Sequence, residues 1–306
     1  MSTVLCVILN WRTPEMTLKA AQSAITAMEG IEGAITIVDN DSQDGSFEAM
    51  REAARDWPRV RVLQSGRNGG YGAGNNHGIR AGLPDGSKPD YVYVLNSDAF
   101  PAPDAIRVLV DYLDAHPDVG FAGSHIHGPE GEPHTTAFRF PSIASEFEGA
   151  AKTGPISRLL KNAIVAPALP TQTTRVDWLA GASVLMRQAV LDQIGIFDET
   201  FFLYFEETDL FRRAARAGWP AVYVIESRVM HIGSVSTGMK DWQRVPGYWF
   251  ASRRYYFEKN HGRLYALAAT AAHVAGLGIY GLRVLVQRKK PHTPPYFLRD
   301  LVKHSL

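Results

Sequence analysis

The sequence predicts an α/β fold with a mostly parallel sheet flanked by helices, followed by a C-terminal helical extension. Three observations predict it. In the first third of the chain, short apolar runs with little polar alternation are separated by helical stretches, as in a sheet covered on both faces. Polar clusters follow four of these runs, at the strand ends where open α/β sheets bind ligands. After residue 242, aromatic and basic residues interleave and lead into a long uncharged run.

The individual elements are predicted from the apolar pattern and the turn residues between them. Strands are expected at residues 4–9, 34–38, 60–63, 91–95, 119–122, 176–186 and 221–225. Helices are expected at residues 14–28, 46–56, 75–82, 101–116, 188–194 and 207–217. The proline-rich stretch 128–174 is expected to be mainly loop. We place one domain at residues 1–240 and an aromatic, basic helical extension at residues 241–306.

Composition excludes several classes of protein. The 306 residues are 45% hydrophobic and 21% charged, which is ordinary for a globular chain. A formal net charge of +1 provides no overall field for nucleic acid. The single cysteine, Cys6, cannot form a disulfide framework or a cysteine zinc site, so we expect a buried core thiol. The N-terminus has no signal-peptide pattern, and we expect a cytoplasmic protein.

The C-terminal tail is strongly basic. Residues 250–306 hold ten Lys or Arg and two Asp or Glu, a charge of +8, which leaves −7 for residues 1–249. Residues 264–282 carry no charge when His273 is neutral. We expect this segment to lie on an anionic membrane surface or to pack on the protein rather than to span a bilayer. A merely solvated helical face explains the charge equally well.

Polar residues follow the first three strands. Asn10 and Trp11 follow the first, Asp-Asn-Asp-Ser (39–42) the second, and the glycine-rich residues 68–76 the third. Alone, the second cluster is also typical of a turn and helix cap. The glycine loop lacks the Gly-Lys-Ser/Thr of a P-loop and does not fit the dinucleotide signature. Its backbone and asparagine amides near a helix start nevertheless suit a diphosphate.

Acidic residues and one histidine extend the candidate site. Asp98 ends the fourth strand and suits a hard divalent cation, or else caps a helix. Glu206 and Glu207 open a helix behind an aromatic run, where the helix dipole alone would favour carboxylates. His231 follows the last strand and could complete a metal site with Asp98.

Taken together, these blocks resemble glycosyltransferase family 2, with its GT-A fold. The resemblance covers residues 3–240, and the bacterial rhamnosyltransferase-like branch is the most similar. The blocks, in order, are Asn-Trp, VDNDSQDGS, GRNGGYGAGNNHGI, LNSDA, WLAGASVLMR, GIFDETFFLYFEETDLFRRAARAG and H-x-G-S-x-S.

The resemblance implies an inverting sugar transfer assisted by Mg²⁺ or Mn²⁺. The donor would be a dTDP- or UDP-linked sugar, with rhamnose as the candidate, and the acceptor a cell-surface glycan or lipid-linked glycan. The enzyme would be peripheral at the inner face of the cytoplasmic membrane. A cation and amide donors would stabilise the departing diphosphate while a carboxylate takes the acceptor proton.

The resemblance also assigns the donor site. Trp11 corresponds to an aromatic beside the nucleotide base and Asp39 to a carboxylate that bonds the base. Asp41 lies in the same loop, with a less defined role. The donor-binding residues are then Asn10, Trp11, Asp39, Asp41, Asn68, Gly70, Asn76, Asn96 and Gly181.

Metal and base positions follow in the same way. The family's Asp-x-Asp reads Asn96-Ser97-Asp98 here, so metal binding rests mainly on Asp98, with His231 as a second ligand. Glu206-Glu207 corresponds to the family's Glu-Asp, whose second acid is the base. Glu207 is therefore the expected general base, with Glu206 beside it in the catalytic pair.

Two other function classes remain open. A sugar-nucleotide pyrophosphorylase would carry an Arg- and Lys-bearing glycine loop after the first strand, where residues 10–14 read Asn-Trp-Arg-Thr-Pro instead. A non-catalytic nucleotide-sugar-binding protein would not need Asp39, Asp98 and Glu207 together.

Overall fold

The computed structural model describes residues 2–233, 242–290 and 293–305, which form two compact units. The first unit comprises residues 2–137, 168–202 and 206–233. The second comprises residues 138–167, 203–205 and the described residues from 242 onward. The boundary that we placed after residue 240 stays a prediction.

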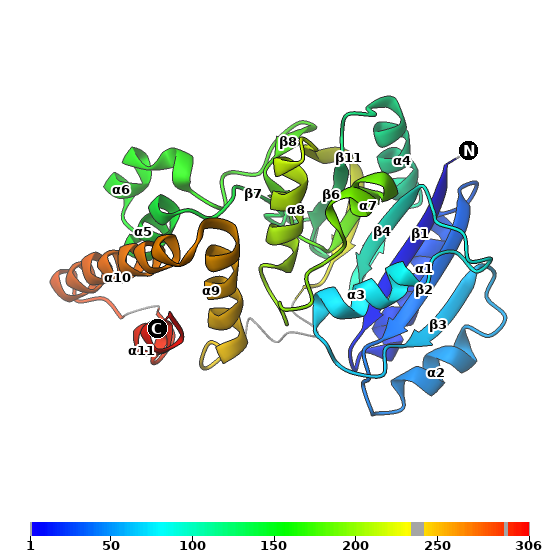
Figure 1. Cartoon of the computed structure of the whole chain (residues 1–306), viewed down its shortest axis with the longest axis horizontal. Helices are drawn as coiled ribbons and strands as arrows, with labels where there is room; N and C mark the ends of the chain where they lie inside the picture. The colour runs from blue at the N-terminus through cyan, green and yellow to red at the C-terminus, as the bar shows by residue number, and fades with distance from the viewer. Residues whose placement is uncertain (1, 234–241, 291–292, 306) are drawn as a thin grey trace. The chain divides into compact units, whose positions relative to one another are not determined.

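The N-terminal half of the first unit is an alternating β/α segment (Figure 1). Its elements are β1 (Thr3–Asn10), α1 (Pro14–Ala27), β2 (Glu32–Asp39), α2 (Ser46–Ala53), β3 (Val60–Gln64), α3 (Tyr71–Arg80) and β4 (Tyr91–Asn96). The four strands pair in parallel in the order β3-β2-β1-β4. Alternate β1 residues Val4, Cys6 and Ile8 lie in the main core cluster, and Cys6 is fully buried there as expected.

The second half of the sheet is mixed rather than parallel. Beyond β4 the order is β10-β6-β11-β5, with β10 antiparallel to both neighbours and β6 parallel to β11. The elements are β5 (Ala99–Pro101), α4 (Ala105–Ala115), β6 (Phe121–His127), β8 (Thr174–Val176), β9 (Trp178–Leu179), β10 (Ser183–Arg187), α7 (Gln188–Ile194), α8 (Glu206–Arg216) and β11 (Ala221–His231). The short strand β7 (Ala137–Phe138) stands at the junction of the units. The prediction of a single strand at residues 176–186 is therefore wrong. Residue 177 separates β8 from β9, and a turn at residues 180–182 separates β9 from β10.

Helix α3 begins four residues earlier than predicted, because its glycines serve close packing. A methyl group on Gly74 would overlap the Leu9 side chain, and one on Gly78 would overlap Val7. Both leucine and valine stand on β1. The helix axis can therefore approach the sheet closely, at the cost of the lower helix propensity of glycine.

The second unit is helical and contains the predicted C-terminal helices. Its elements are α5 (Ile143–Ala151), α6 (Gly154–Leu159), a 3₁₀ turn η1 (Lys161–Ala163), α9 (Gly247–His261), α10 (Arg263–Val286) and α11 (Phe297–Ser305). Two helices, α5 and α6, thus lie in the stretch predicted as loop. A reciprocal capping box between Ser142 and Ser145 starts α5.

Helix α10 is the one candidate membrane span in the described part of the chain. It has the length and composition to cross a bilayer, although the core helix of a soluble protein can pass the same test. Only 17% of its most apolar window is buried inside the structure.

Candidate active site

The ends of β1 and β2 are joined by a saturated hydrogen-bond cluster. Asp39 is fully buried, and its Oδ1 accepts from Asn10 Nδ2 at 2.7 Å and Ser42 Oγ at 2.6 Å. Its Oδ2 accepts from the Ser42 backbone N–H at 3.0 Å. Asn10 Oδ1 in turn accepts from Thr17 Oγ1 at 2.8 Å. Parallel strands end at the same edge, so side chains distant in sequence meet here and fix the loops that follow.

Trp11 and Asp41 extend from this cluster. Trp11 is half-buried, with the Arg12 guanidinium carbon 4.6 Å from the centre of its ring. Arg12 and Asp41 both have φ of 57°, a conformation that side chains adopt rarely. Arg12 is held there because its backbone N–H donates to Ser42 Oγ at 3.0 Å. The cluster thus fixes the backbone beside a partly accessible indole.

The turn before α3 is tied to both neighbouring segments. Asn68 Oδ1 accepts from Asn40 Nδ2 at 3.0 Å and from the Gly70 backbone N–H at 3.1 Å. Gly70 has φ of 88°, and any side chain there would overlap the carbonyl of Phe202. That carbonyl accepts from the Tyr71 backbone N–H at 3.0 Å. Only glycine fits this crossing.

Asn76 is brought to a loop far away in sequence. It is fully buried; its Nδ2 donates to Phe197 O at 2.8 Å and to Glu199 Oε1 at 3.0 Å. Its Oδ1 accepts from the Phe197 backbone N–H at 3.1 Å. In this state the amide braces the loop that leads towards α8.

Asp98 and His231 form the candidate cation site. His231 Nε2 lies 3.0 Å from Asp98 Oδ1, and the Gly233 N–H donates to Asp98 Oδ2 at 3.0 Å. Burial opposes the charged form of Asp98, but the hydrogen bonds and charge of His231 and the Gly233 amide outweigh it, so the pKa is lowered. Asn96 Nδ2 lies 3.4 Å from His231 Nε2. Because α4 begins only at Ala105, Asp98 does not cap that helix.

This pair fits a cation that takes most of its ligands from elsewhere. Across the described residues, no cluster of three or more His, Cys, Asp or Glu side chains could hold a metal ion. Adjacent carboxylate and imidazole donors nevertheless suit Mn²⁺, and Mg²⁺ keeps waters and substrate phosphates when it binds one carboxylate. The predicted Ser234 and Ser236 of the H-x-G-S-x-S block lie outside the described residues.

Glu206 and Glu207 open α8 with different surroundings. Glu206 is 1% exposed, and its Oε2 has no hydrogen-bond partner within the described part of the chain. Burial and the neighbouring charge of Glu207 raise the pKa of Glu206 well above 4.5. Glu207 is half-buried, and burial raises its pKa as well.

Tyr71 and Gly181 hold Glu207. The Gly181 N–H donates to Glu207 Oε1 at 3.3 Å, and Tyr71 OH donates to Gly181 O at 2.7 Å. Burial raises the pKa of Tyr71, and so do the charges of Glu207, Glu206 and Asp98. The phenol thus stands among the three carboxylates.

The aromatic run before these acids is strained. Tyr204 and Phe205 have φ of 68° and 70°, two successive left-handed residues without glycine. Phe205 packs against Trp249 and Tyr256, within the second unit. Phe201 is buried, whereas Phe202 is 40% exposed.

Some residues of the cluster were not predicted. Tyr71 and Asn40 stood inside the quoted blocks without an assigned role, and Ser42 was noted only as turn chemistry. Their roles depend on contacts between separate strands and helices, so residue type alone does not indicate them. Asn40 was detectable in principle, since a polar residue directly after a buried strand lies at the binding edge.

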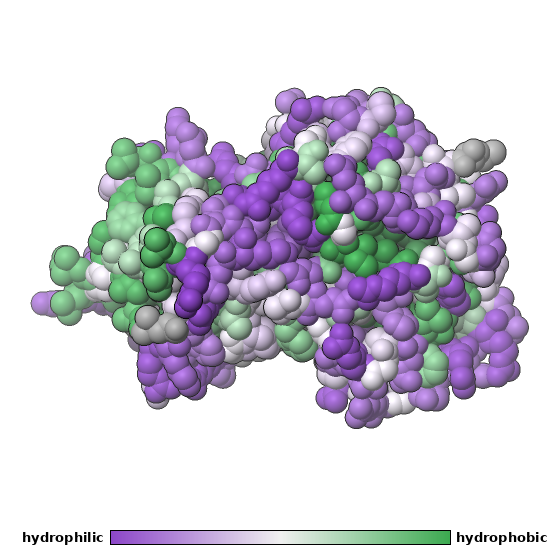
Figure 2. All heavy atoms as spheres, in the orientation of Figure 1, coloured by the Kyte–Doolittle hydropathy of each residue, from purple (hydrophilic) through white to green (hydrophobic). Residues whose placement is uncertain are grey.

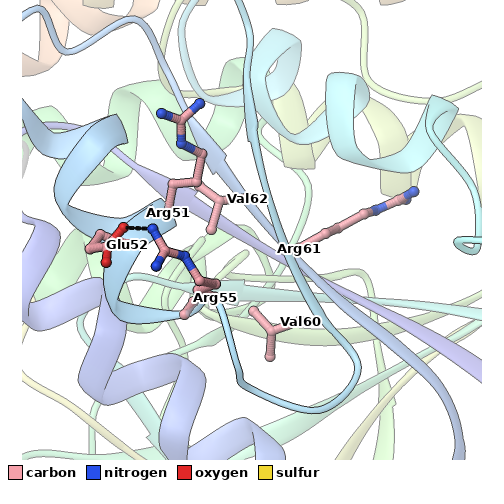
Figure 3. A pocket seen from close by; sticks show the side chains of 7 residues that line it. Arg51, Glu52, Arg55, Val60, Arg61 and Val62 are labelled. Carbon is pink, nitrogen blue, oxygen red and sulfur yellow. Dashed lines mark hydrogen bonds and ion pairs between the residues drawn. The ribbon is translucent and has the colours of Figure 1, made fainter.

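A separate surface cavity of about 360 Å³ lies between α2 and β3 (Figure 3). Arg61 points away from it and donates to Thr36 Oγ1, while Arg55, in the turn after α2, pairs with Glu52 of that helix. None of the candidate site residues lines this cavity.

The family model described as "Glycosyltransferase like family 2" matches residues 3–245. The chain belongs to this family. A relative from Mycobacterium tuberculosis (strain H37Rv), named N-acetylglucosaminyl-diphospho-decaprenol L-rhamnosyltransferase, is 32% identical over 78% of this chain and 79% of its own length. Rhamnosyltransferase WbbL of Escherichia coli K12 is 27% identical over 53% of this chain and 61% of its own length. The protein is therefore a rhamnosyltransferase-like glycosyltransferase.

Solved structures support the GT-A fold. A mannosyltransferase from Pyrobaculum calidifontis, in complex with GDP-Man and Mn²⁺, aligns with 99% of this chain and 85% of its own, with a TM-score of 0.58 and 13% identity. GalNAc-T7, with UDP, GalNAc and Mn²⁺, aligns with 99% of this chain at a TM-score of 0.61 and 14% identity. This chain spans about half, 54%, of the GalNAc-T7 chain. The predicted fold class is confirmed.

Proposed function

We propose that this glycosyltransferase moves a sugar, with rhamnose as the first candidate, from a dTDP- or UDP-linked donor to a hydroxyl of a lipid-linked glycan. The names of the relatives from M. tuberculosis and E. coli support the rhamnosyl donor, and the former supports the lipid-linked acceptor. The family match over residues 3–245 supports a glycosyltransferase over a pyrophosphorylase. An acceptor of this kind places the enzyme on the cytoplasmic side of a membrane.

The observation that carries the mechanism is the setting of Glu207. Its raised pKa makes the carboxylate a better proton acceptor near neutral pH than an ordinary glutamate. The Gly181 N–H fixes one of its oxygens. Glu207 takes the proton of the acceptor hydroxyl. The hydroxyl oxygen of the acceptor attacks the anomeric carbon from the face opposite the diphosphate, which leaves, and the centre inverts in one displacement.

Glu206 assists without exchanging the proton itself. Because it is buried and its pKa is raised, its neutral form is favoured beside Glu207. A neutral neighbour spares Glu207 the repulsion of a second negative charge. Glu207 is then the only member of the pair that needs to be ionised for catalysis.

Asp98 and His231 would hold a divalent cation, Mn²⁺ or Mg²⁺. When bound, such an ion offsets the charge that develops on a departing diphosphate. Asn96, 3.4 Å from His231, is placed to donate its amide to the same oxygens. Trp11 offers a face for the base, while Asp39, Asn68 and Gly70 shape the loops around it.

The first experiment is a nucleotide-sugar screen with Asp98→Asn as the informative variant. Nucleoside-diphosphate binding should strengthen when Mn²⁺ is added to wild type, and Asp98→Asn should reduce this gain at least about tenfold, since a carboxylate ligand is lost. Calorimetric titration with and without metal measures it. Asp56→Asn, which changes an exposed carboxylate in the turn after α2 and outside the site, is the control.

Unchanged metal dependence in Asp98→Asn would remove Asp98 from the cation site. Transfer to a lipid-linked acceptor, with the product's anomeric configuration read by NMR, tests the inverting mechanism separately. A product that retains the donor's configuration would overturn it.

A further inference from the structure

Helix α10 presents an unbroken apolar face to solvent along its whole length. The exposed large side chains include Leu264 (84% exposed) at its start and Leu282, Leu285 and Val286 (64%, 74% and 74%) at its end. Between them the exposed positions are Leu267, Ala268, Ala271, Ala275, Gly278 and Ile279. The steps of three and four residues keep one stripe over about 36 Å of helix.

The opposite face of α10 is bonded to the second unit. Gly276 packs against the Phe147 carbonyl of α5. His273 Nδ1 lies 2.6 Å from Glu146 Oε2, which also accepts from Arg253 Nη2 at 2.8 Å. Arg253 is 1% exposed. Insertion of α10 across a bilayer would carry this ion cluster into hydrocarbon, which is costly. One face of the helix is therefore fixed on the protein, and the other faces solvent.

The segment of the chain that contains α10 carries charges of one sign. Residues 259–299 contain seven Lys or Arg and no Asp or Glu. Arg288, Lys289 and Lys290 follow the C-cap residue Gln287 and are exposed. A second copy docked by the same face would bring only cations to the contact, whereas an anionic lipid surface offers the complementary charge.

The neighbouring part of the same unit has a similar character. Leu159 of α6 is 83% exposed and stands beside the exposed Arg158. Figure 2 shows hydrophobic residues gathered at the end of the unit that carries α5, α6 and α10. A soluble surface normally avoids a contiguous apolar patch of this kind unless something binds it.

We infer that the exposed face of α10 is the membrane-docking surface of this protein, with the helix lying in the plane of an anionic lipid leaflet. The leucines insert at the level of the acyl boundary, and Arg288, Lys289 and Lys290 contact the headgroups. The inference rests on the proposed lipid-linked acceptor for its purpose alone. The contact itself is a property of this helix.

Co-sedimentation with vesicles tests the surface on the full chain. Wild type should bind vesicles of phosphatidylcholine with phosphatidylglycerol, bind phosphatidylcholine alone far less, and dissociate at high salt. The triple variant R288Q/K289Q/K290Q should weaken binding about 100-fold, because each cation near an anionic surface contributes a factor of about five. The face variant L264Q/L282Q/L285Q should weaken it at least about tenfold on both lipids.

The matched control is K19Q/R51Q/R55Q, which removes three exposed cations of the first unit and should leave binding unchanged. Circular dichroism confirms folding, and because the charge variant alters only exposed residues after the helix, it remains informative if the face variant unfolds. Donor hydrolysis in solution is scored separately, so a wrong enzyme assignment and a wrong surface give different results.

Three outcomes would overturn the inference. One is equal binding by wild type and the charge variant. Another is a dimer in sedimentation velocity that the face variant dissociates, which would identify a second copy as the occupant. The third is resistance to salt and alkaline extraction, which would identify a spanning helix.

Discussion

The oxygens of two acidic positions in the first unit, Asp39 at the end of β2 and Glu206-Glu207 at the start of α8, are partnered in opposite ways. Asp39 accepts three hydrogen bonds, from Asn10 and twice from Ser42. Glu206, equally buried, keeps Oε2 without a partner among the described residues, and Glu207 Oε1 accepts from the Gly181 N–H at 3.3 Å. One carboxylate is enclosed by donors and the other pair is left short of them.

Under the proposed function, the difference would separate an acid that supports the loops from acids that take part in the chemistry. Buried donors around a carboxylate fix its geometry and the loops that supply them. A buried carboxyl group with too few donors instead has its pKa raised and exchanges protons at higher pH. The comparison teaches that satisfaction of hydrogen bonds, more than residue type, indicates which acid does chemistry.

The largest effect should come from Glu207→Gln. We expect kcat to fall at least about 100-fold because the general base is lost, while donor affinity stays unchanged. Steady-state transfer at saturating donor measures the first, and nucleotide titration the second. Glu206→Gln should do less to kcat; if it proves the more damaging, the roles of the two acids are reversed.

Asp39→Asn should act on the fold and on donor binding instead. The isosteric amide places an NH₂ group against donors from Asn10 or Ser42, at a cost of about 2 kcal/mol in the free energy of unfolding. Urea denaturation measures it. Asp41→Asn, in the same loop, is the control because Asp41 is half-buried and accepts from the Gln43 side chain. If the two variants had equal free energies of unfolding, the hydrogen bonds to Asp39 would not stabilise the fold as proposed.

The sequence predicts those parts of the structure that depend on neighbouring residues in the chain. The strands β1, β2, β3 and β4 were predicted to within two residues, because each is a short, mostly apolar run bounded by polar turn residues. The antiparallel strand β10 was missed as a separate element, since its direction is set by neighbours β4 and β6.

The same limit applies to the site. Carboxylates at strand ends and at the start of α8 are visible in the sequence, and the structure does bring Asp98 and His231 within 3.0 Å. Tyr71 supports Glu207 through Gly181, and Tyr71 and Gly181 are 110 residues apart in the sequence. No spacing along the chain indicates such a contact. The assigned roles stay predictions until the variants are measured.

Tyr71→Phe sharpens the comparison on the chemical side. Removal of the hydroxyl frees Gly181 O and loosens the amide that holds Glu207, so we expect kcat to fall about tenfold with little change in donor KM. If a higher donor concentration restored the wild-type transfer rate, the defect would lie in donor binding, and this positioning role would be contradicted. Tyr93→Phe is the matched control, because Tyr93 OH makes a comparable 2.7 Å contact with Ser183 Oγ inside the core. It should lower stability and leave kcat unchanged.

The smallest effect, and the most direct test of the comparison, is the pH dependence of Glu206→Gln stability. A carboxyl group whose pKa is raised on folding binds its proton more tightly in the folded chain than in the unfolded one. Its contribution to stability is therefore complete below the ordinary value of 4.5 and is lost as pH rises through the folded pKa. Glutamine has no proton to lose, so the stability of the variant should increase relative to that of wild type as pH rises.

Urea unfolding of both proteins below the ordinary glutamate pKa and at about pH 8 gives this difference directly. The sign is what matters, because a carboxylate with a full set of donors would show the reverse and would lose stability on substitution as pH rises. A Glu206→Gln difference that is flat with pH would mean that Glu206 carries no raised pKa, and the distinction between the two acidic clusters would fail at that residue.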